Sequence, residues 1–440
     1  MLRLTFTVCA LACCVLSSAQ SELPKHVLQL AQLKRNVQAA LKTLPNYSCV
    51  ETIERSIRKN AQQPFRHVDM VHVEVAVTGD RELYSWPGAN KFEDRDITDM
   101  INSGTVSNGE FALALRSVIT NNVSIVTWHS YEEQFGRFNE LYAAKRQIIR
   151  WDYRIPYNLS GWILRYGGRR GRVSEAGSFW ADAESLDVLR LEINADEIPP
   201  DLPVTAVKNT LEYTRVRFGS QELLIPQSAE LTVTELTGQQ RRNVIEFSHC
   251  REFSAQTTLS FEAAANITGK PAMTVEEITL PAGLRLPIRL SHTVDSETAA
   301  VGDPISATVE SDVKQKGKLL VPQGAILRGR IRQLDAHATP REYHVVGLEF
   351  TDLEFPGHHG RFFGEMEYIG LSPALMEPTT GIRTGVDESM LSHLQIATRV
   401  QRETYWTREI PGVSTFSIKG GRLVLPEGLH MTWRTMNLAK

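Results

Sequence analysis

The sequence predicts a mainly β protein with a few helices: a large curved antiparallel sheet (half-barrel) with two helices, followed by a smaller β-barrel or sandwich domain. Three observations lead to this fold class. Strand-like stretches recur about every ten residues through most of the chain. Only two stretches carry the apolar spacing of an amphipathic helix. A turn-and-strand motif is repeated in the last third of the sequence.

The first residues, Met1 to Ala19, have the pattern of a secretory signal peptide. Arg3 supplies positive charge, an apolar run follows, and small residues precede a cleavage point before Gln20. The run is too short to span a bilayer as a stable helix, and no later run approaches a span. We therefore expect export of a mature chain without a transmembrane segment. The expected destination is the periplasm, with the extracellular medium or an outer-membrane association as alternatives.

Two helices are expected in the first domain. Between Val27 and Leu44, apolar residues recur at helical spacing, and Pro45 ends the pattern. A second helix is predicted near 108–119, because Ser107-Asn108-Gly109-Glu110 has the form of a capping box and apolar residues follow it. Each helix should lay its apolar stripe on a sheet.

Nearly all other segments of the first domain, residues 20–262, alternate like half-buried strands. Val71, Val73, Val75 and Val77 give the clearest example. Further strands are expected at 148–153, 177–181, 188–193, 211–218, 222–225, 230–234 and 244–253. Residues 263–276 have the composition of a linker, and a second domain is expected over 277–440.

The second domain contains an internal repeat of the form apolar-Pro-x-Gly. Its copies are Leu280-Pro281-Ala282-Gly283, Val321-Pro322-Gln323-Gly324 and Leu425-Pro426-Glu427-Gly428, each followed at the same interval by an arginine. Pro suits the first corner of a tight turn and Gly its last position, so each copy predicts a turn that leads into a strand. We expect residues 370–392, rich in Pro, Thr and Gly, to be a long loop between two copies, either a plain surface loop or a partner-binding one.

Composition narrows the class of protein. A chain of 440 residues is too long for one small core, so two domains are expected. A formal net charge of −3 argues against a nucleic-acid-binding protein, which would carry a basic face. We expect the basic run Arg165 to Arg172 to be a solvated hairpin, with a phosphate site as the alternative.

Two cysteines, Cys49 and Cys250, remain once the leader is removed. In an oxidising compartment they are candidates for a disulfide that would tie the two ends of the first domain together. Two unpaired thiols are the alternative.

No motif in the sequence assigns a reaction. Nucleophile elbows, phosphate-binding glycine loops and zinc-binding helices are all missing from the sequence, so no catalytic residue, metal or cofactor is expected. His358 and His359 are adjacent, and neighbouring residues on a strand point in opposite directions, so we expect a solvated turn and not a metal site.

Four tryptophans of the first domain are candidates for lining an apolar ligand groove: Trp128, Trp151, Trp162 and Trp180. The alternative is that they fill the interior of a wide curved sheet.

Short phrases in the first domain resemble known families. Leu44-Pro45-Asn46-Tyr47-Ser48-Cys49, Gly109-Glu110-Phe111 and Glu197-Ile198-Pro199-Pro200 are similar to segments of secreted acidobacterial-type proteins of unknown function. Phe179-Trp180-Ala181-Asp182-Ala183 followed by Val188-Leu189-Arg190 resembles a hairpin of the LolA/LolB-type lipoprotein carriers. This resemblance implies a curved antiparallel sheet that wraps around helices and encloses an apolar cavity for acyl chains.

The second domain resembles the β-barrel of TrbI-type conjugal-transfer proteins. The shared text is Leu280 to Gly283 through Arg289, then Val301-Gly302-Asp303-Pro304, then Val321 to Gly324 with Gly329. The resemblance implies a domain suited to assembly or surface contacts.

Together these observations predict an exported, non-catalytic envelope protein that binds a hydrophobic or lipid-like ligand, an envelope protein partner, or both. One alternative is a structural assembly subunit of the cell envelope or of a secretion apparatus. The other is a secreted hydrolase with an unrecognised site.

Overall fold

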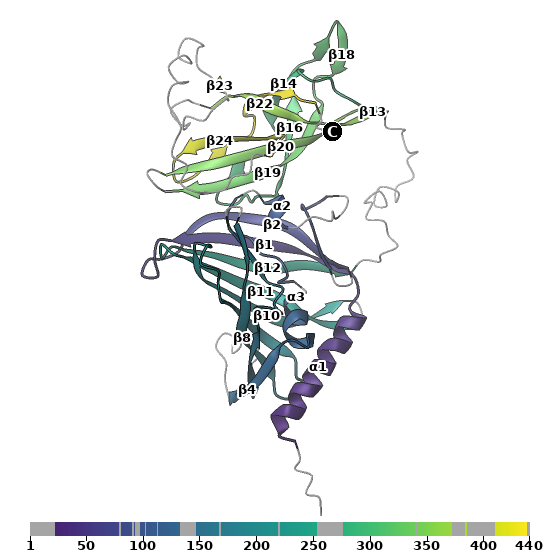
Figure 1. Cartoon of the computed structure of the whole chain (residues 1–440). Helices are drawn as coiled ribbons and strands as arrows, with labels where there is room; N and C mark the ends of the chain where they lie inside the picture. The colour runs from purple at the N-terminus through teal and green to yellow at the C-terminus, as the bar shows by residue number, and fades with distance from the viewer. Residues whose placement is uncertain are drawn as a thin grey trace, which may run out of the picture.

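The computed structural model describes residues 23–78, 81–89, 92, 97–101, 103–111, 113–132, 147–166, 169–218, 221–252, 276–338, 342–371, 383–384 and 410–437. The expected leader, the linker apart from Glu276, and most of the 370–392 loop lie outside the described residues. The described residues form two β-rich units stacked end to end (Figure 1). The predicted fold class is confirmed: the protein is mainly β, with a large curled antiparallel sheet of half-barrel shape.

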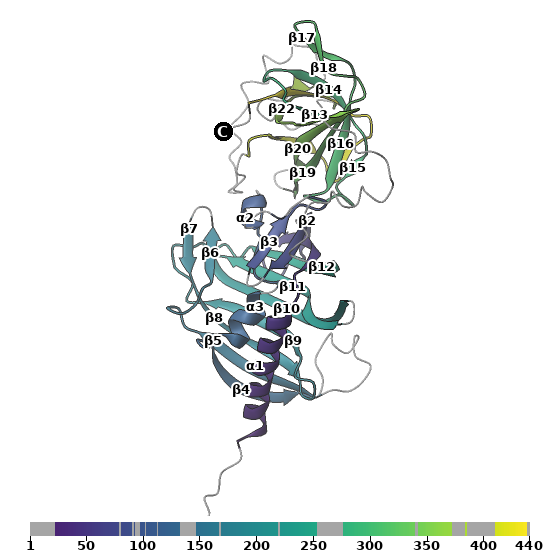
Figure 2. The same ribbon diagram turned by 90° about the vertical axis from the view of Figure 1, so that its right-hand side faces the viewer.

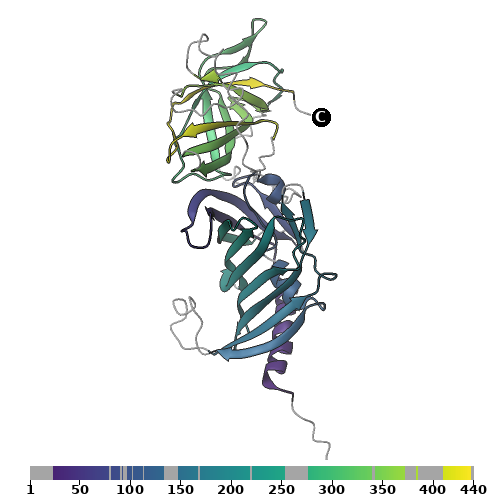
Figure 3. The same cartoon turned by 60° about the vertical axis from the view of Figure 1, so that its left-hand side comes forward.

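Within the described residues, a ten-stranded sheet forms the first unit, in the order β3-β2-β1-β12-β11-β10-β9-β8-β5-β4. Its strands are β1 (Tyr47–Arg58), β2 (Arg66–Thr78), β3 (Arg81–Ser85), β4 (Ile125–Glu132), β5 (Ile148–Ile155), β8 (Ser174–Asp182), β9 (Val188–Asp196), β10 (Val204–Phe218), β11 (Gln221–Glu235) and β12 (Gln240–Glu252). All of its neighbouring strands run antiparallel. Figure 3 shows how the sheet curls.

Alternating residues of these strands fill the concave side of the sheet. Val71, Val73 and Val75 are fully buried on β2, as their alternation predicts. They join one large apolar core that continues across β1, β5, β8 and β9. The sheet therefore curves around side chains that its own strands supply.

Helix α1 (Lys25–Thr43) matches the first expected helix and lies along the open side of the curled sheet (Figures 1 and 2). Leu33 and Val37 bury its apolar stripe in the core. The Gln29 side chain fastens the helix to the sheet, because its Nε2 donates to the Ala183 carbonyl oxygen at 3.0 Å and its Oε1 accepts from the Tyr131 hydroxyl at 2.8 Å.

The second expected helix is shorter than predicted and starts later. It consists of α3 (Leu113–Leu115) continued by the π-helical turn η1 (Arg116–Thr120). The carboxylate of Glu82 accepts hydrogen bonds from the backbone N–H groups of Gly109 (2.8 Å) and Leu113 (3.3 Å). Glu110, which the capping-box pattern assigns to the helix start, accepts a bond from Asn209 of β10. A carboxylate from a distant strand thus takes the place of the local cap.

A third, unexpected helix, α2 (Ile97–Met100), lies between the two units, and a small hairpin stands beside the sheet (Figure 2). The hairpin consists of β6 (Ile163–Tyr166) and β7 (Arg169–Arg172), paired antiparallel. Among the described residues, no helix is both long enough and apolar enough to cross a membrane.

The described strands of the second unit form a second curled sheet, in the order β13-β21-β20-β19-β16-β14-β26-β22-β23, with β24 paired to β20. Their bounds are β13 (Glu276–Ile278), β14 (Arg285–Leu290), β16 (Pro304–Val309), β19 (Ile326–His337), β20 (Tyr343–Phe355), β21 (His358–Arg361), β22 (Gly364–Ile369), β23 (Arg383–Thr384), β24 (Val413–Lys419) and β26 (His430–Thr435). Two small ribbons add β15 (Val294–Asp295) with β25 (Val424–Leu425), and β17 (Val313–Gln315) with β18 (Lys318–Val321). Trp433 and Phe350 meet edge to face in the core, with 5.1 Å between ring centroids.

The repeated motif of the second unit forms turns, as predicted. Gly283, Gly324 and Gly428 have φ values of 84°, 84° and 79°, a region that L side chains rarely adopt. Each turn leads into a strand of the second sheet: β14, β19 or β26. The spacing of Pro and Gly therefore marked the strand starts correctly.

The two units are joined by backbone hydrogen bonds. The N–H of His72 donates to the Val301 carbonyl oxygen, and the N–H of Val301 donates to the Met70 carbonyl oxygen, both at 2.8 Å. Gly302, at φ 100°, follows directly, and a Cβ there would overlap the His72 carbonyl oxygen. This close approach explains why glycine occupies the position.

Candidate functional site

A cavity of about 840 Å³ lies on the concave side of the first sheet. Its lining residues come mainly from β9, β10 and β11, from the segment that leads into α3 and from the β6–β7 hairpin, and they include Ile410 of the second unit. The lining mixes aliphatic side chains, with Ile155, Val207 and Leu231 among them, with polar and charged ones such as Glu110 and Asn209. The volume falls within the range of about 300–1,000 Å³ that is usual for ligand pockets.

The apolar wall follows from strand alternation. Along β10, Val207, Asn209 and Leu211 are buried on one face, and Val207 and Asn209 line the cavity. Val207 and Leu231 form a small apolar cluster, separate from the main core, against which the hairpin residue Leu164 packs. The cavity lining therefore includes residues of both the main core and this small cluster.

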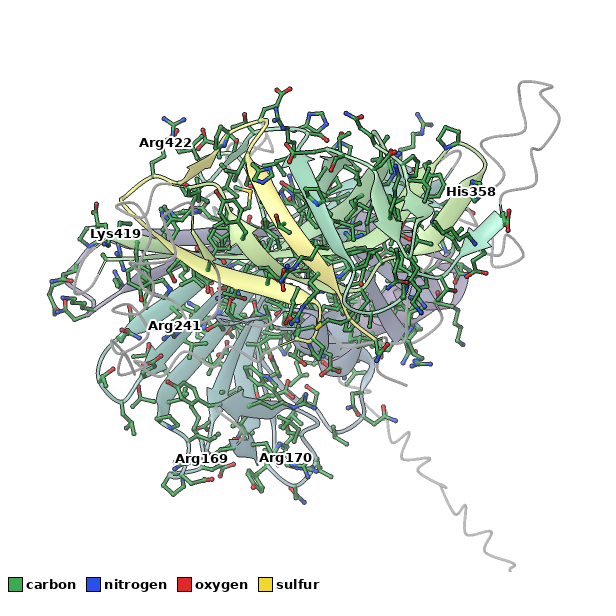
Figure 4. The ribbon with its side chains drawn as sticks, turned by 90° about the horizontal axis from the view of Figure 1, so that it is seen from above. Arg169, Arg170, Arg241, His358, Lys419 and Arg422 are labelled. Carbon is green, nitrogen blue, oxygen red and sulfur yellow. A yellow bond between two sulfur atoms is a disulfide. The ribbon has the colours of Figure 1, made fainter. Side chains whose placement is uncertain are left out.

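The hairpin is fastened over this end of the sheet by its arginines. Arg169 Nη1 donates to the Asp201 carbonyl oxygen at 2.7 Å, and Arg172 Nη1 donates to the Ser160 carbonyl oxygen at 2.8 Å. The basic run therefore forms the expected exposed hairpin. Seen from above, Arg169 and Arg170 project together at one end of the molecule, far from His358 of the second unit (Figure 4).

Two buried polar side chains line the cavity side by side. Asn209 Nδ2 donates to Glu110 Oε1 at 2.7 Å, and only 7% of Asn209 and 4% of Glu110 are exposed. Burial, together with the nearby charge of Glu82, raises the pKa of Glu110 from its ordinary 4.5 to about 7, against the opposing effect of hydrogen bonds from Ser107 and Asn209. Glu110 therefore keeps its proton to a higher pH than an exposed glutamate does.

Two further charged groups of the lining, Glu175 and Arg241, are engaged with other residues. Glu175 accepts a bond from the Ser160 hydroxyl at 3.0 Å, and burial raises the pKa of its carboxyl. Arg241 Nε donates to Glu235 Oε1 at 2.7 Å. The described lining contains neither histidine nor cysteine, so it offers no Ser–His or Cys–His pair for nucleophilic catalysis.

The structure separates the four candidate tryptophans, and only Trp162 belongs to the cavity lining. Trp151 is fully buried in the main core, stacked on Phe179 with 5.3 Å between centroids. This matches the alternative in which the tryptophans fill the sheet interior.

The remaining two tryptophans lie outside both the cavity and the main core. Trp128 is 40% exposed and stacks on His26 of α1 at 4.7 Å. Trp180 follows Phe179 on β8 and therefore points to the opposite, convex face, where Arg150 and Arg190 lie over its ring. Their positions do not form a shared groove.

The most informative site residues, Asn209 and Glu110, were not among the candidates. One sequence signal for Asn209 exists: it is a polar residue at an inward position of a strand whose flanking inward residues, Val207 and Leu211, are apolar. Its partner is 99 positions away in the chain, so the pair itself has no local signal.

Cys49 and Cys250 form a disulfide in the structure. It links the neighbouring strands β1 and β12, where the register shifts by one residue. The bond lies in the sheet and is not part of the cavity lining.

His358 and His359 lie on β21 and turn toward different acids. His358 Nε2 lies 3.6 Å from Glu276 Oε2, and His359 Nε2 lies 3.4 Å from Asp352 Oδ1. In the part of the chain that the structure describes, no group of three or more His, Cys, Asp or Glu side chains could hold a metal ion.

No family model matches the chain, and no curated protein matches its sequence. A crystal structure described as a "putative outer membrane lipoprotein-sorting protein domain" from Vibrio parahaemolyticus is similar at 12% identity and a TM-score of 0.29. The match covers 53% of this chain and 94% of that chain.

Proposed function

We propose that this protein is an exported, non-catalytic carrier or receptor for a hydrophobic, lipid-like ligand, held in the cavity of the first unit. The observation that carries the proposal is the cavity itself: about 840 Å³ of space whose lining combines aliphatic side chains with a few buried polar groups. A concave site of this size and mixed lining is the usual form of a small-molecule binding pocket.

Other features support the same proposal. The hairpin covers the cavity with its own apolar residues and is fastened by two arginines of β7, so the space is shaped by dedicated structure. The leader pattern of residues 1–19 favours export, and a disulfide suits an oxidising compartment. A contact between the second unit and an envelope partner stays a prediction.

The proposal is tested by filling the cavity. Val207→Trp places a large side chain into the lining, whereas Lys208→Trp adds the same side chain at the exposed neighbouring position of β10 and serves as the matched control. Binding of the neutral apolar dye Nile red is measured by fluorescence titration of the mature chain. We expect Val207→Trp to weaken dye binding by about tenfold or more, which corresponds to about 1.4 kcal/mol. We expect Lys208→Trp to bind like the wild type.

Two results would contradict the proposal. One is a wild-type chain, freed of co-purified lipid, that does not bind the dye. The other is equal binding by the two tryptophan variants, because the dye would then bind outside the cavity. Mass spectrometry of lipids extracted from the purified chain would identify a natural ligand.

A further inference from the structure

One wall of the cavity has little regular structure of its own. Most of the described residues from 98 to 107 belong to the cavity lining, and we call this segment the junction wall. Apart from the short helix α2, its described residues adopt neither helix nor strand. Backbone groups outside helices and sheets need other partners, so such a segment is held by the bonds that neighbouring elements make to it.

Both units hold the junction wall by hydrogen bonds. From the first sheet, side chains of β1 and β12 donate to two of its carbonyl oxygens. From the second unit, Arg332 Nη2 donates to the Met100 carbonyl oxygen at 3.2 Å, and Asp335 Oδ1 accepts from the Ser103 hydroxyl at 2.9 Å. The wall is therefore positioned partly by residues of the second unit.

A single strand, β19, supplies both of these second-unit contacts and lies next to the first unit (Figure 1). Its pairing with β20 skips Arg332, which is the extra residue of a β-bulge, and a bulge can redirect a side chain. Glu349 Oε2 accepts from Arg332 Nη1 at 2.6 Å and so fixes the guanidinium. Only 8% of Arg332 and 6% of Asp335 are exposed, so both charged side chains are enclosed at the junction.

The second unit also borders the cavity directly, because Ile410 belongs to the lining. We propose that the second unit completes the ligand site: β19 positions the junction wall, Ile410 extends the apolar lining, and tight ligand binding requires the two units to be docked. This inference rests on the proposed function and adds positioning residues to the same cavity. Loosening of the junction would consequently release the ligand.

The first test separates the hydrogen bond to the junction wall from the charge of Asp335. Asp335→Leu and Asp335→Asn both remove the carboxylate, but only asparagine keeps an oxygen that can accept from the Ser103 hydroxyl. In Nile red titrations of the mature chain, we expect Asp335→Leu to weaken binding by about tenfold. The emission of the bound dye should shift to longer wavelength, because a loosened wall admits water. Asp335→Asn should stay within about threefold of the wild type.

His72→Leu is the matched control for the junction. His72 Nδ1 lies 2.7 Å from Asp303 Oδ1 across the same pair of units, and neither residue belongs to the cavity lining. This variant should bind the dye with wild-type affinity and emission. Circular dichroism establishes that each variant is folded under the conditions of the titration.

The second test leaves the charged junction intact. Ile410→Ala removes part of the lining that the second unit contributes, and we expect dye binding to weaken by about fivefold. Val413→Ala is its matched control, since Val413 is a half-buried aliphatic residue of the same unit outside the lining. This pair decides the matter even if Asp335→Leu does not fold.

The possible failures are distinguishable. If Val207→Trp abolishes dye binding but Asp335→Leu or Ile410→Ala binds like the wild type, the proposed function stands and the role of the second unit is overturned. Equal weakening by Asp335→Leu and Asp335→Asn, or by Asp335→Leu and His72→Leu, overturns it as well. If the wild type does not bind the dye, both proposals fail together.

Discussion

The hydroxyl of Ser103 donates a 2.9 Å hydrogen bond to Asp335 Oδ1, although the two residues are 232 positions apart in the chain. The bond crosses from the first unit to the second and lies beside a buried ion pair. Arg55 makes a two-pronged contact with Asp69, and its guanidinium lies 3.7 Å from Asp335. The two units are therefore joined by buried charge as well as by the backbone bonds at Val301.

Arg55 is the cation that neutralises the buried carboxylates between the two units, so its removal should destabilise the protein. Replacing it in Arg55→Met leaves Asp69 and Asp335 buried without their cation, and we expect a loss of about 3–5 kcal/mol in the free energy of unfolding. Urea unfolding measures the change. The control is Arg215→Met, which breaks the exposed pair with Asp187 and should cost less than about 1 kcal/mol. Equal costs for the two variants would contradict this account of the junction.

The close approach at Gly302 gives a second prediction. In Gly302→Ala the new Cβ would overlap the His72 carbonyl oxygen and crowd the Trp86 ring, so the contact between the units must open. We expect destabilisation well above the roughly 1–2 kcal/mol that a left-handed conformation alone costs an alanine. Gly283→Ala is the matched control, since it has φ 84° and nothing within 4 Å of an added Cβ. Thermal unfolding measures the midpoint of each variant. Similar midpoints for Gly302→Ala and Gly283→Ala would contradict the prediction.

The contribution of two buried carboxyl groups to the stability of the protein should fall as the pH rises toward neutrality. Burial raises the pKa of Glu110 from 4.5, and that of Asp335 from 3.8, to about 7 in each case. Between the lower and the higher values these two groups hold protons in the folded chain that they have released in the unfolded chain. Their contribution to the free energy of unfolding consequently decreases with pH across this window, and the share of Glu110 is on the order of 3 kcal/mol.

The variant Glu110→Gln isolates the contribution of Glu110 to the pH dependence of stability. The amide oxygen of glutamine still accepts the bond from Asn209, but the side chain no longer titrates. Chemical unfolding from about pH 5 to pH 8 should show a shallower decline in the variant than in the wild type. Parallel curves for the two proteins would show that Glu110 does not titrate in this range.

The disulfide should contribute strongly to stability because of the length of chain that it closes. Cys49 and Cys250 are 201 positions apart, and the chain-entropy model gives an upper value of about 5 kcal/mol for such a loop. Reduction with dithiothreitol should therefore lower the thermal midpoint of the wild type. The double variant Cys49→Ala/Cys250→Ala should unfold at the lower temperature with or without reductant. A wild type that is insensitive to reductant, with its thiols shown to be free, would refute the prediction.

Local patterns predicted the elements of this fold well. Alternating apolar residues located β2, helical spacing located α1, and Pro and Gly located the turns before β14, β19 and β26. Each of these signals depends on neighbours only a few residues apart. The second helix was predicted less well, since its start depends on Glu82, which comes from another part of the chain.

The candidate site was predicted only in part. Trp162 lies in the cavity lining, but Trp151 is in the core and Trp180 is on the convex face. All are large aromatic residues in β-rich sequence, and nothing local distinguishes a side chain that borders a void from one that fills the interior. The distinction depends on the curvature of the sheet and on where the hairpin folds back.

The sequence by itself determined that this protein is mainly β, with a helix near residues 27–44 and glycine turns that start three strands, because those features arise from short-range periodicity and backbone preference. Only the tertiary structure decided that Asn209 meets Glu110, that Ser103 meets Asp335, and that a cavity remains beneath the hairpin. The physical reason is distance along the chain: these contacts join segments separated by about a hundred residues or more, and they exist only after the sheet has curled and the two units have docked.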